Sequence, residues 1–412
     1  MSVPGIAVHR PTVVPPIESY GTRIRREPSA FARGEHERGL AVLVDDLSLR
    51  GAAELDVLLD LAGQSLIELV TTSGANGSSR LWIEEEPDEQ SDQFLVHTAH
   101  AEGTNLTGIW PASQWLRRVE TYVRQVGGDQ AAIRARFLLA GAGEGHYDAI
   151  ALDDIVPASA TRAEHHLTLK ETVALTGLFL RSRGQTDIRM PRGWDTARSI
   201  HDQRFTVSRF ALHEGWRWWS ACSGSPATRD VGWVPITRIE QAIRSRDEVL
   251  VEVLAGGGGA ARDLDLLYHF DAMLVWLGSA LDAVAQVTAA AHQVGGPPFA
   301  VGWLRGQWRQ RLEHSAPGLF EMTEVGRLER AVLDLVAAFR NTIHGPSITS
   351  VGYRSGGRPQ QSMVQLPAEA SARAAAACDE LGGRGLWGYQ SIGREPEHAL
   401  WDPYVVVQLL LP

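Results

Sequence analysis

In the first third of the chain, apolar residues alternate as they do in strands, with two stretches of helical spacing between them. Residues 39–49 (GLAVLVDDLSL) predict a strand, and residues 52–72 carry apolar side chains at three- and four-residue steps, which predicts a helix. SSRLWIEEE and DQFLVHTAH predict two further strands around the acidic turn at 84–92. A second helix is predicted over 111–127, where Gly127 ends the pattern.

The segment GAGEG (141–145) lies between AIRARFLLA and HYDAIALDD. A glycine turn after a strand is typical of dinucleotide sites, but such a site needs a helix next, to hold the phosphates on its first amides. HYDAIAL alternates like a strand, so we predict a hairpin here and no nucleotide site. Residues 34–156 are therefore predicted to form a small α/β or α+β domain. Residues 1–33 are rich in Pro and Arg and predict an arm that is flexible or packed without regular structure.

The middle of the chain, residues 157–255, is predicted as a mixed helical and irregular region rich in Trp and Arg. Helices are expected over 167–184 and 238–255. The segment GWRWWSACSG (215–224) holds Trp216 and Trp218 at the spacing of one strand face. Aromatic faces can stack on bases, but no basic groove is evident beside them. We therefore favour packing against a core.

The glycine run 256–259 is the clearest linker in the chain. Beyond it, the patterns at 261–293, 303–314 and 322–344 predict helices, and 260–346 is expected to be an antiparallel helical bundle. The tail 347–412 follows, where SMVQLP, EASARAAAACDEL and YVVVQLLLP predict strand, helix and strand. The first bundle helix repeats apolar residues at positions Leu264, Leu267, Leu274, Leu277, Leu281 and Val284. The fold class expected for the whole chain is α+β.

Composition and net charge limit the classes of function that the sequence supports. The formal net charge of −10 argues against a broad basic surface that coats nucleic acid. A single lysine, Lys170, stands among 39 basic residues, so arginine is used throughout and is weak evidence for phosphate binding. No stretch of 18 apolar residues and no signal peptide is evident, so we expect no membrane partner and a cytoplasmic location.

The sequence gives little support for a metal site or for cysteine chemistry. Cys222 and Cys378 are the only cysteines and form no CxxC motif. Histidines cluster only as EHH (164–166), HTAH (97–100) and HEGW (213–216), none with metal-ligand spacing on a helix. No serine lies in a nucleophile-elbow context. We therefore expect no metal and no cofactor.

The segment AAFRNTIHGPS (337–347) carries the candidate chemistry. His344, Gly345 and Pro346 are typical of a helix end. Asn341 is a poor helix residue in a predicted helix interior, and the chain contains only two other asparagines, Asn76 and Asn105. A specific role for Asn341 is therefore expected.

A long helix containing FDAMLVWLGSALDAVAQV, an intervening helix and a helix ending in FRNTIHG resemble the HEPN superfamily over residues 260–346. The resemblance implies that Arg340, Asn341 and His344 are the candidate catalytic residues. His344 would activate a ribose 2′-hydroxyl, Arg340 would stabilise the phosphorane, and Asn341 would orient one of these or the phosphate. A His pKa near neutrality and the arginine fork suit these roles.

Three residues separate Arg340 from His344, fewer than is usual in the family, and a helix would place both side chains on one face.

The resemblance leaves two candidate functions. We favour a HEPN-like helical module that dimerises or binds a partner or RNA, with a homodimer formed through the bundle. The alternative is a metal-independent endoribonuclease, a toxin or antiviral-type effector, that uses the Arg–His pair.

Overall fold

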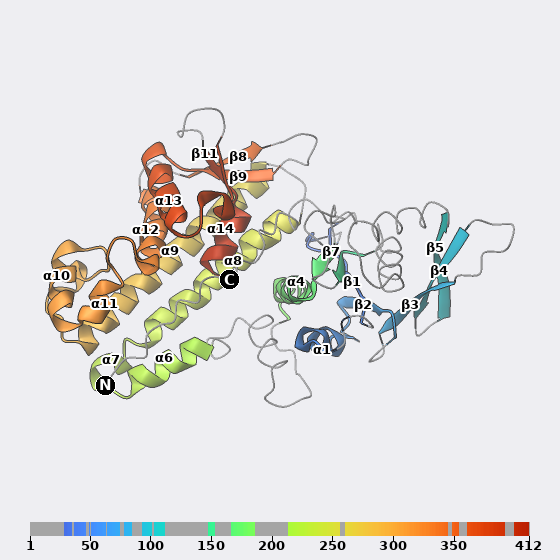
Figure 1. Ribbon diagram of the computed structural model, residues 1–412, viewed down its shortest axis with the longest axis horizontal. Coiled ribbons are helices and arrows are strands. Elements are labelled where there is room, and N and C mark those ends of the chain that lie inside the picture. The colour runs from blue at the N-terminus through green and yellow to red at the C-terminus, as the bar shows by residue number, and fades with distance from the viewer. Residues whose placement is uncertain are drawn as a thin grey trace. The chain divides into compact units, whose positions relative to one another are not determined.

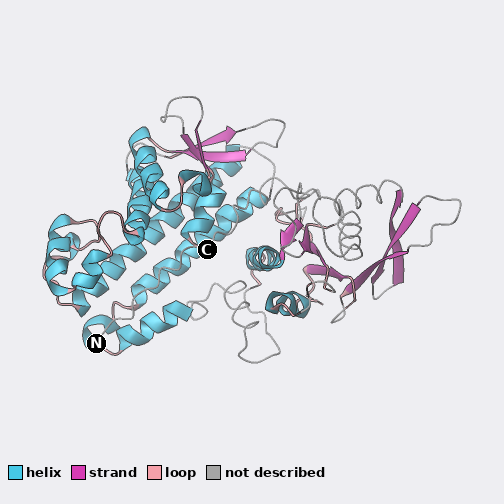
Figure 2. Cartoon of the chain, viewed as in Figure 1, coloured by secondary structure: helices cyan, strands magenta, loops and turns pink. Residues whose placement is uncertain are grey.

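The protein is α+β and divides into two compact units, Thr22–Thr206 and Val207–Pro412. Figures 1 and 2 show one unit that carries the larger sheet and one mainly helical unit that carries a smaller sheet. The computed structural model describes residues 29–34, 37–46, 49, 51–62, 64–74, 78–84, 93–100, 103–111, 147–152, 166–185, 213–255, 260–344, 348–353, 361–391 and 399–411. Each unit is described by itself below.

The unit Thr22–Thr206 is built on a seven-stranded sheet of order β5-β4-β3-β2-β1-β6-β7. The five strands β3, β2, β1, β6 and β7 pair in parallel, whereas β4 and β5 extend one edge as antiparallel strands. The strands are β1 (Leu40–Val44), β2 (Ile67–Thr71), β3 (Ser79–Glu84), β4 (Gln93–His100), β5 (Gly103–Pro111), β6 (Ala149–Leu152) and β7 (His166–Thr168).

Strand β1 is the central one of the five parallel strands and reads LAVLV, with every residue buried. Continuous apolar sequence is typical of a parallel strand covered on both faces. Leu40 pairs with Ile67 of β2, and Val42 pairs with Ala149 of β6. The strand order therefore reverses at β1, because β2 to β5 lie on one side of it and β6 and β7 lie on the other.

Two helices accompany the sheet, α1 (Ala53–Asp60) and α4 (Leu169–Ser182). A capping box begins α4: the Thr168 hydroxyl accepts from the Glu171 backbone N–H, and the Glu171 carboxylate accepts from the Thr168 N–H. Near its end, Phe179 packs edge-on against Phe31 at a centroid distance of 5.7 Å. The described residues 29–34, which precede β1, form no helix or strand, and this contact holds them against α4.

Two sequence predictions differ in this unit. The helix predicted over 52–72 ends at Asp60, and its second half is the strand β2, because IELVT pairs in parallel with β1. The predicted hairpin is wrong for β6, which is hydrogen bonded to β1 on one side and β7 on the other. A short apolar run does not reveal whether its partner is local or distant. Its proposed partner 132–140 and the predicted helix 111–127 lie outside the described residues.

The unit Val207–Pro412 contains a group of helices and a small sheet (Figure 1). The two longest helices, α8 and α9, pack side by side. The helices are α6 (His213–Ser223), α7 (Pro226–Arg229), α8 (Trp233–Leu254), α9 (Ala260–Ala291), α10 (Gly306–Ser315), α11 (Pro317–Glu321), α12 (Leu328–Arg340), α13 (Ala368–Glu380) and α14 (Pro403–Leu410).

A four-stranded antiparallel sheet of order β10-β11-β9-β8 completes this unit. Trp401 is fully buried at its centre, with its ring edge-on to Phe339 at 5.4 Å and to Tyr389 at 5.1 Å. Its indole N–H donates to the Ser371 hydroxyl of α13. One side chain thus joins the sheet to α12 and α13. The strands are β8 (Thr349–Tyr353), β9 (Gln361–Gln365), β10 (Tyr389–Ser391) and β11 (Ala399–Trp401).

The long helix predicted over 261–293 is confirmed as α9, but two other predictions in this unit are wrong. The segment YVVVQLLLP is the helix α14 and not a strand: Asp402 caps its start, Pro403 stands at its first position, and burial of its valines outweighs their β propensity. The Trp-rich segment 215–224 lies in the helix α6, where Trp219 stacks on Trp233 at 4.1 Å.

The division into units also differs from the predicted domains at 34–156, 157–255, 260–346 and 347–412. Strand β7 and α4 belong with the first sheet, because β7 pairs with β6. Helix α8 belongs with α9, and the tail packs on the helices through Trp401. The contacts between segments, and not the glycine run at 256–259, therefore decide where the two units divide.

Helix α9 is long and apolar enough over Asp263–Ala291 to cross a membrane by length and composition. Half of that stretch is buried inside the unit, as in the core helix of a soluble protein. The lack of an 18-residue apolar run in the sequence therefore does not by itself exclude a membrane-spanning helix.

Asp402 makes the stability of this unit depend on pH. Its carboxylate caps α14 by accepting from the Tyr404 N–H at 3.0 Å, and burial raises its pKa from 3.8 to about 6. The folded protein therefore holds this proton more tightly than the unfolded chain does. Stability from this group is complete below about pH 4 and is lost as the pH rises through about 6.

An Asp402→Asn variant keeps a capping oxygen but cannot ionise. We expect the wild-type Tm, measured relative to that of the variant, to fall between about pH 4 and pH 7 and then to level off. Thermal denaturation of both proteins over this range measures the difference. Parallel Tm profiles would contradict the assignment.

Candidate functional site

Arg340 ends α12, and Asn341–His344 follow as a 3-10 turn. The helix is held against α9 by Phe339, which is fully buried and lies edge-on to Phe270 at 5.8 Å. The three residues singled out by the sequence thus lie together along the chain at the end of α12, next to α9.

The Arg340 guanidinium is already paired within the chain. Its Nη1 donates to Asp282 Oδ2 of α9 at 2.9 Å, with both side chains partly exposed. The aliphatic part of Arg340 crosses α9 at Gly278, where a Cβ atom would lie 2.5 Å from Arg340 Cδ. Glycine in the middle of α9 is therefore explained by the passage of this arginine.

Asn341 is exposed and caps α12 in the right-handed helical region, with its backbone N–H bonded to the Ala337 carbonyl. The prediction that it lies in a helix interior is therefore wrong, because the α-helix ends one residue before it. Its side chain is thus on the surface, where the α-helix passes into the 3-10 turn.

The 3-10 turn also changes the relation between positions 340 and 344. Four residues advance about 40° around an α-helix beyond a full turn, but about 120° in a 3-10 helix. The expectation that an i, i+4 spacing places both side chains on one helix face does not hold for this backbone. The side chain of His344 lies outside the described residues.

Helix α9 carries apolar side chains that the described residues of its unit leave exposed. Leu264 is 67% exposed, Tyr268 is 69% exposed and Val275 is 38% exposed. These positions follow one face of the helix at steps of four and seven residues. We call these three residues the α9 stripe. The sequence listed Leu264 with Leu274 and Leu277 in one apolar repeat, and that periodicity did not distinguish the exposed position from the buried ones.

Asp271 lies on the same face of α9, between Tyr268 and Val275. Its Oδ1 atom is buried and accepts no hydrogen bond from the described residues, and burial raises the pKa of its carboxyl. A buried acceptor without a donor costs free energy. Asp271 thus places one buried carboxylate oxygen next to the α9 stripe.

A second polar arrangement lies at the carboxyl ends of β1 and β2. Asp45 and Asp46 follow β1 directly and are both buried. Asp46 accepts from the Thr72 hydroxyl at 2.6 Å, from the Ser73 N–H at 3.0 Å and from the Ser73 hydroxyl. Open parallel sheets bind ligands at such an edge, where the strand order reverses.

This arrangement was not among the predicted sites, although two aspartates follow a fully apolar strand and Asp153 and Asp154 follow β6 in the same way. The described donors to Asp46 come from the loop after β2, so its burial is explained by the connection of the two strands.

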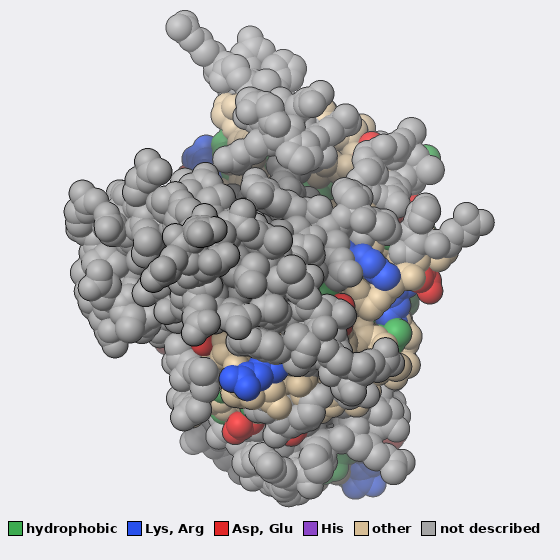
Figure 3. Space-filling model, turned by 90° about the vertical axis from the view of Figure 1, so that its right-hand side faces the viewer, with side chains coloured by type: hydrophobic (Ala, Val, Ile, Leu, Met, Phe, Trp, Pro, Cys, Tyr) green, Lys and Arg blue, Asp and Glu red, His purple; other side chains and the backbone are tan. Residues whose placement is uncertain are grey.

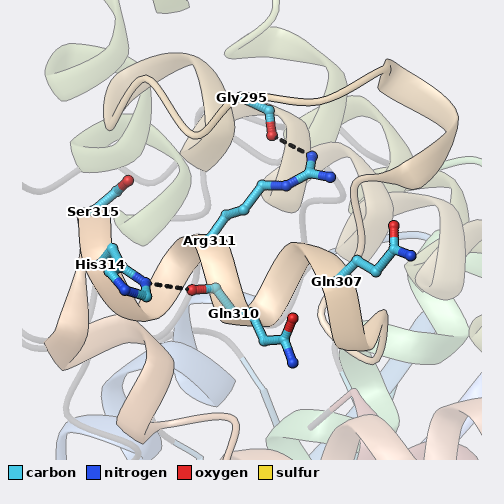
Figure 4. Close-up of a pocket in the computed structure, with 6 residues that line it drawn as sticks. All are labelled: Gly295, Gln307, Gln310, Arg311, His314 and Ser315. Atoms are coloured by element: carbon cyan, nitrogen blue, oxygen red, sulfur yellow. Dashed lines mark hydrogen bonds between the residues drawn. The ribbon is translucent and has the colours of Figure 1, made fainter.

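The pocket in Figure 4 lies along α10 and has a volume of about 590 Å³. Its two candidate ligand-binding side chains are used internally. Arg311 donates to the Gly295 carbonyl at 2.7 Å, and His314 Nδ1 lies 2.8 Å from the Gln310 carbonyl oxygen. The pocket is an open surface hollow whose arginine holds the loop before α10.

Charge on the described surface is mixed. On the face drawn in Figure 3, basic and acidic side chains of the described residues lie close to one another in small groups. Among the described residues, no group of three or more His, Cys, Asp or Glu side chains could hold a metal ion. The mixed charge of the described residues on the face in Figure 3 does not point to a broad basic surface there.

Comparison with protein-family models, with characterised proteins and with solved structures gave no significant match for this chain.

Proposed function

We propose that the unit Val207–Pro412 is a HEPN-like, non-catalytic helical module that dimerises, with the α9 stripe as its contact surface. The observation that carries this proposal is the exposure of Leu264 and Tyr268 on a helix that is otherwise packed into its unit. Two large apolar side chains one turn apart in water are typical of an interaction surface when they lie in one patch.

The contacts of Arg340 support a structural role for residues 340–344. A ribonuclease would need this guanidinium to meet a phosphate, but Asp282 already neutralises it at 2.9 Å. The pair is partly exposed, so it contributes little to stability, about 0–1 kcal/mol. Its effect is to hold Arg340 across Gly278 and to keep the end of α12 against α9.

A Leu264→Glu substitution tests the proposal. A charge placed within an apolar contact has to be desolvated, so the dimer Kd should rise at least about tenfold. Light scattering of the purified full chain over a wide range of concentration measures this Kd. Gln286→Glu is the matched control, because Gln286 is exposed on the same helix beyond the stripe, and its Kd should change less than about twofold.

Two results would overturn the proposal. One is a protein that stays monomeric at every concentration, or a dimer that Leu264→Glu does not weaken. The other is RNA cleavage in EDTA that leaves 2′,3′-cyclic phosphate ends and is abolished by His344→Ala. That result would establish the ribonuclease in place of the non-catalytic module.

A further inference from the structure

The junction between β11 and α14 contains the only Asp–Pro peptide bond in the chain, Asp402–Pro403. An aspartate side chain can reach its own backbone carbonyl carbon and close a five-membered ring, and such an attack is favoured because the reacting groups are already together. When the next residue is proline, the leaving group is a secondary amine, whose nitrogen takes up a proton more readily than that of an ordinary peptide bond. Asp–Pro bonds are therefore prone to break in acid.

The fold holds the Asp402 carboxyl group alongside this bond. Asp402 has extended backbone angles, φ −77° and ψ 108°, and Pro403 is the first residue of α14. The Asp402 Oδ1 atom accepts from the Tyr404 N–H at 3.0 Å, and the ring closed by this hydrogen bond includes the Asp402–Pro403 bond itself. The Asp402 N–H in turn donates to the Gly388 carbonyl at 3.0 Å. The carboxyl group is thus fixed beside the peptide bond that it can attack.

The surroundings of Asp402 keep its carboxyl group protonated in mild acid. Burial raises the pKa of this carboxyl to about 6, and the backbone N–H groups of Tyr404 and Val405 lower it by less. The bond breaks only when a proton reaches the departing nitrogen, so a carboxyl group that keeps its proton up to a higher pH can supply that proton itself. The nucleophile and the acid are then parts of one side chain.

Charged groups on the elements around α14 are paired with one another. Arg384, which follows α13, binds Asp379 and lies over the Tyr389 ring of β10. On α8, which packs against α14, Arg246 pairs with Asp247 at 2.8 Å. Strand β9 carries no titratable side chain. The causes of the raised carboxyl pKa include none of these groups, so burial is what the site depends on.

We propose that the protein cleaves its own chain between Asp402 and Pro403 in mild acid and so cuts the covalent link between β11 and α14. A side-chain oxygen of Asp402 adds to the backbone carbonyl carbon of the same residue, and the carboxyl proton passes to the Pro403 nitrogen. The C–N bond breaks, which leaves a cyclic anhydride at residue 402 and the free amine of Pro403. One water molecule then hydrolyses the anhydride to two carboxyl groups, and Asp402 is exposed enough for water to reach it.

Mass spectrometry of the denatured protein tests this cleavage. Denaturing conditions are needed because the buried side chains of α14 hold the two parts together after the cut. The full chain is incubated at pH 5 and at pH 8, and the fragment that begins at Pro403 should form roughly a hundredfold faster at pH 5, where the carboxyl group is protonated. No such fragment at pH 5 would overturn the proposal.

Unfolding the protein separates the effect of the fold from the ordinary weakness of an Asp–Pro bond. With a pKa of about 6 the carboxyl group is about nine-tenths protonated at pH 5, whereas at its ordinary value of 3.8 it is less than one-tenth protonated. Cleavage at pH 5 should therefore be at least about tenfold faster in the folded protein than in the same protein unfolded in urea. Equal rates would show that the fold does not promote the reaction.

Two variants test the roles of the two residues. Asp402→Asn keeps a capping oxygen but lacks the acidic proton, and Pro403→Ala keeps the carboxyl group but changes the departing nitrogen. Each should lower the rate at pH 5 at least about tenfold. Glu380→Gln removes an exposed carboxylate at the end of α13 and should change the rate less than about twofold. An Asp402→Asn variant that is cut as fast as the wild type would overturn the mechanism.

Discussion

A Trp401→Ala variant is expected to lose about 3–5 kcal/mol of the free energy of unfolding of the helical unit. Trp401 is fully buried and touches three separate elements: Phe339 of α12, Tyr389 of β10 and Ser371 of α13. Removing the indole leaves a cavity between them, because a rigid sheet and two helices cannot all move inward to fill it.

Urea denaturation followed by circular dichroism measures this loss. The control is Trp216→Ala, which removes the same side chain from a position that is 50% exposed, and should cost less than about 1 kcal/mol. Equal losses in the two variants would show that the sheet, α12 and α13 do not share one core around Trp401.

An Asp148→Ala variant is expected to destabilise the sheet unit by a similar amount, about 3–5 kcal/mol. Asp148 lies just before β6 with its side chain fully buried, and its Oδ2 and Oδ1 atoms accept from Nη1 and Nη2 of Arg38 at 2.6 and 2.5 Å. It also accepts from the Ala41 N–H of β1 at 2.9 Å. Without the carboxylate, the Ala41 N–H loses its acceptor, and a mostly buried guanidinium loses the charge that balances it, although its Nη1 also donates to the Gly39 carbonyl at 2.9 Å.

The shift of the urea midpoint measures this effect as well. Asp56→Ala is the control, because Asp56 is exposed in the first turn of α1 and contributes only through the helix dipole, about 0.3–1 kcal/mol. If Asp148→Ala proved as mild as Asp56→Ala, the bidentate pair would not be what joins β6 to β1.

The candidate site was predictable only in part. The sequence placed Arg340, Asn341 and His344 at a helix end, and Gly345 and Pro346 justified that prediction. It could not show that Asp282 pairs with Arg340, because 58 residues separate them and only the crossing of α12 over α9 brings them together. The predicted helix ran to residue 344, whereas the α-helix ends at Arg340, which changed the expected environment of Asn341 from helix interior to exposed cap.

Local patterns alone determined the strongest elements of this protein. The apolar run of β1, the capping box of α4 and the long apolar period of α9 are properties of neighbouring residues, so the sequence was sufficient for them. The overall α+β class follows from the same patterns.

Long-range contacts decided the rest. Whether IELVT and YVVVQLLL become strand or helix depends on the partner each meets: β1 pairs with the first, and the core of the helical unit buries the second after its Asp402–Pro403 start. Both segments are short and apolar, so their intrinsic preferences are small beside the free energy of burial. For the same reason, only the tertiary structure could show that α9 buries one apolar face and leaves Leu264, Tyr268 and Val275 in water.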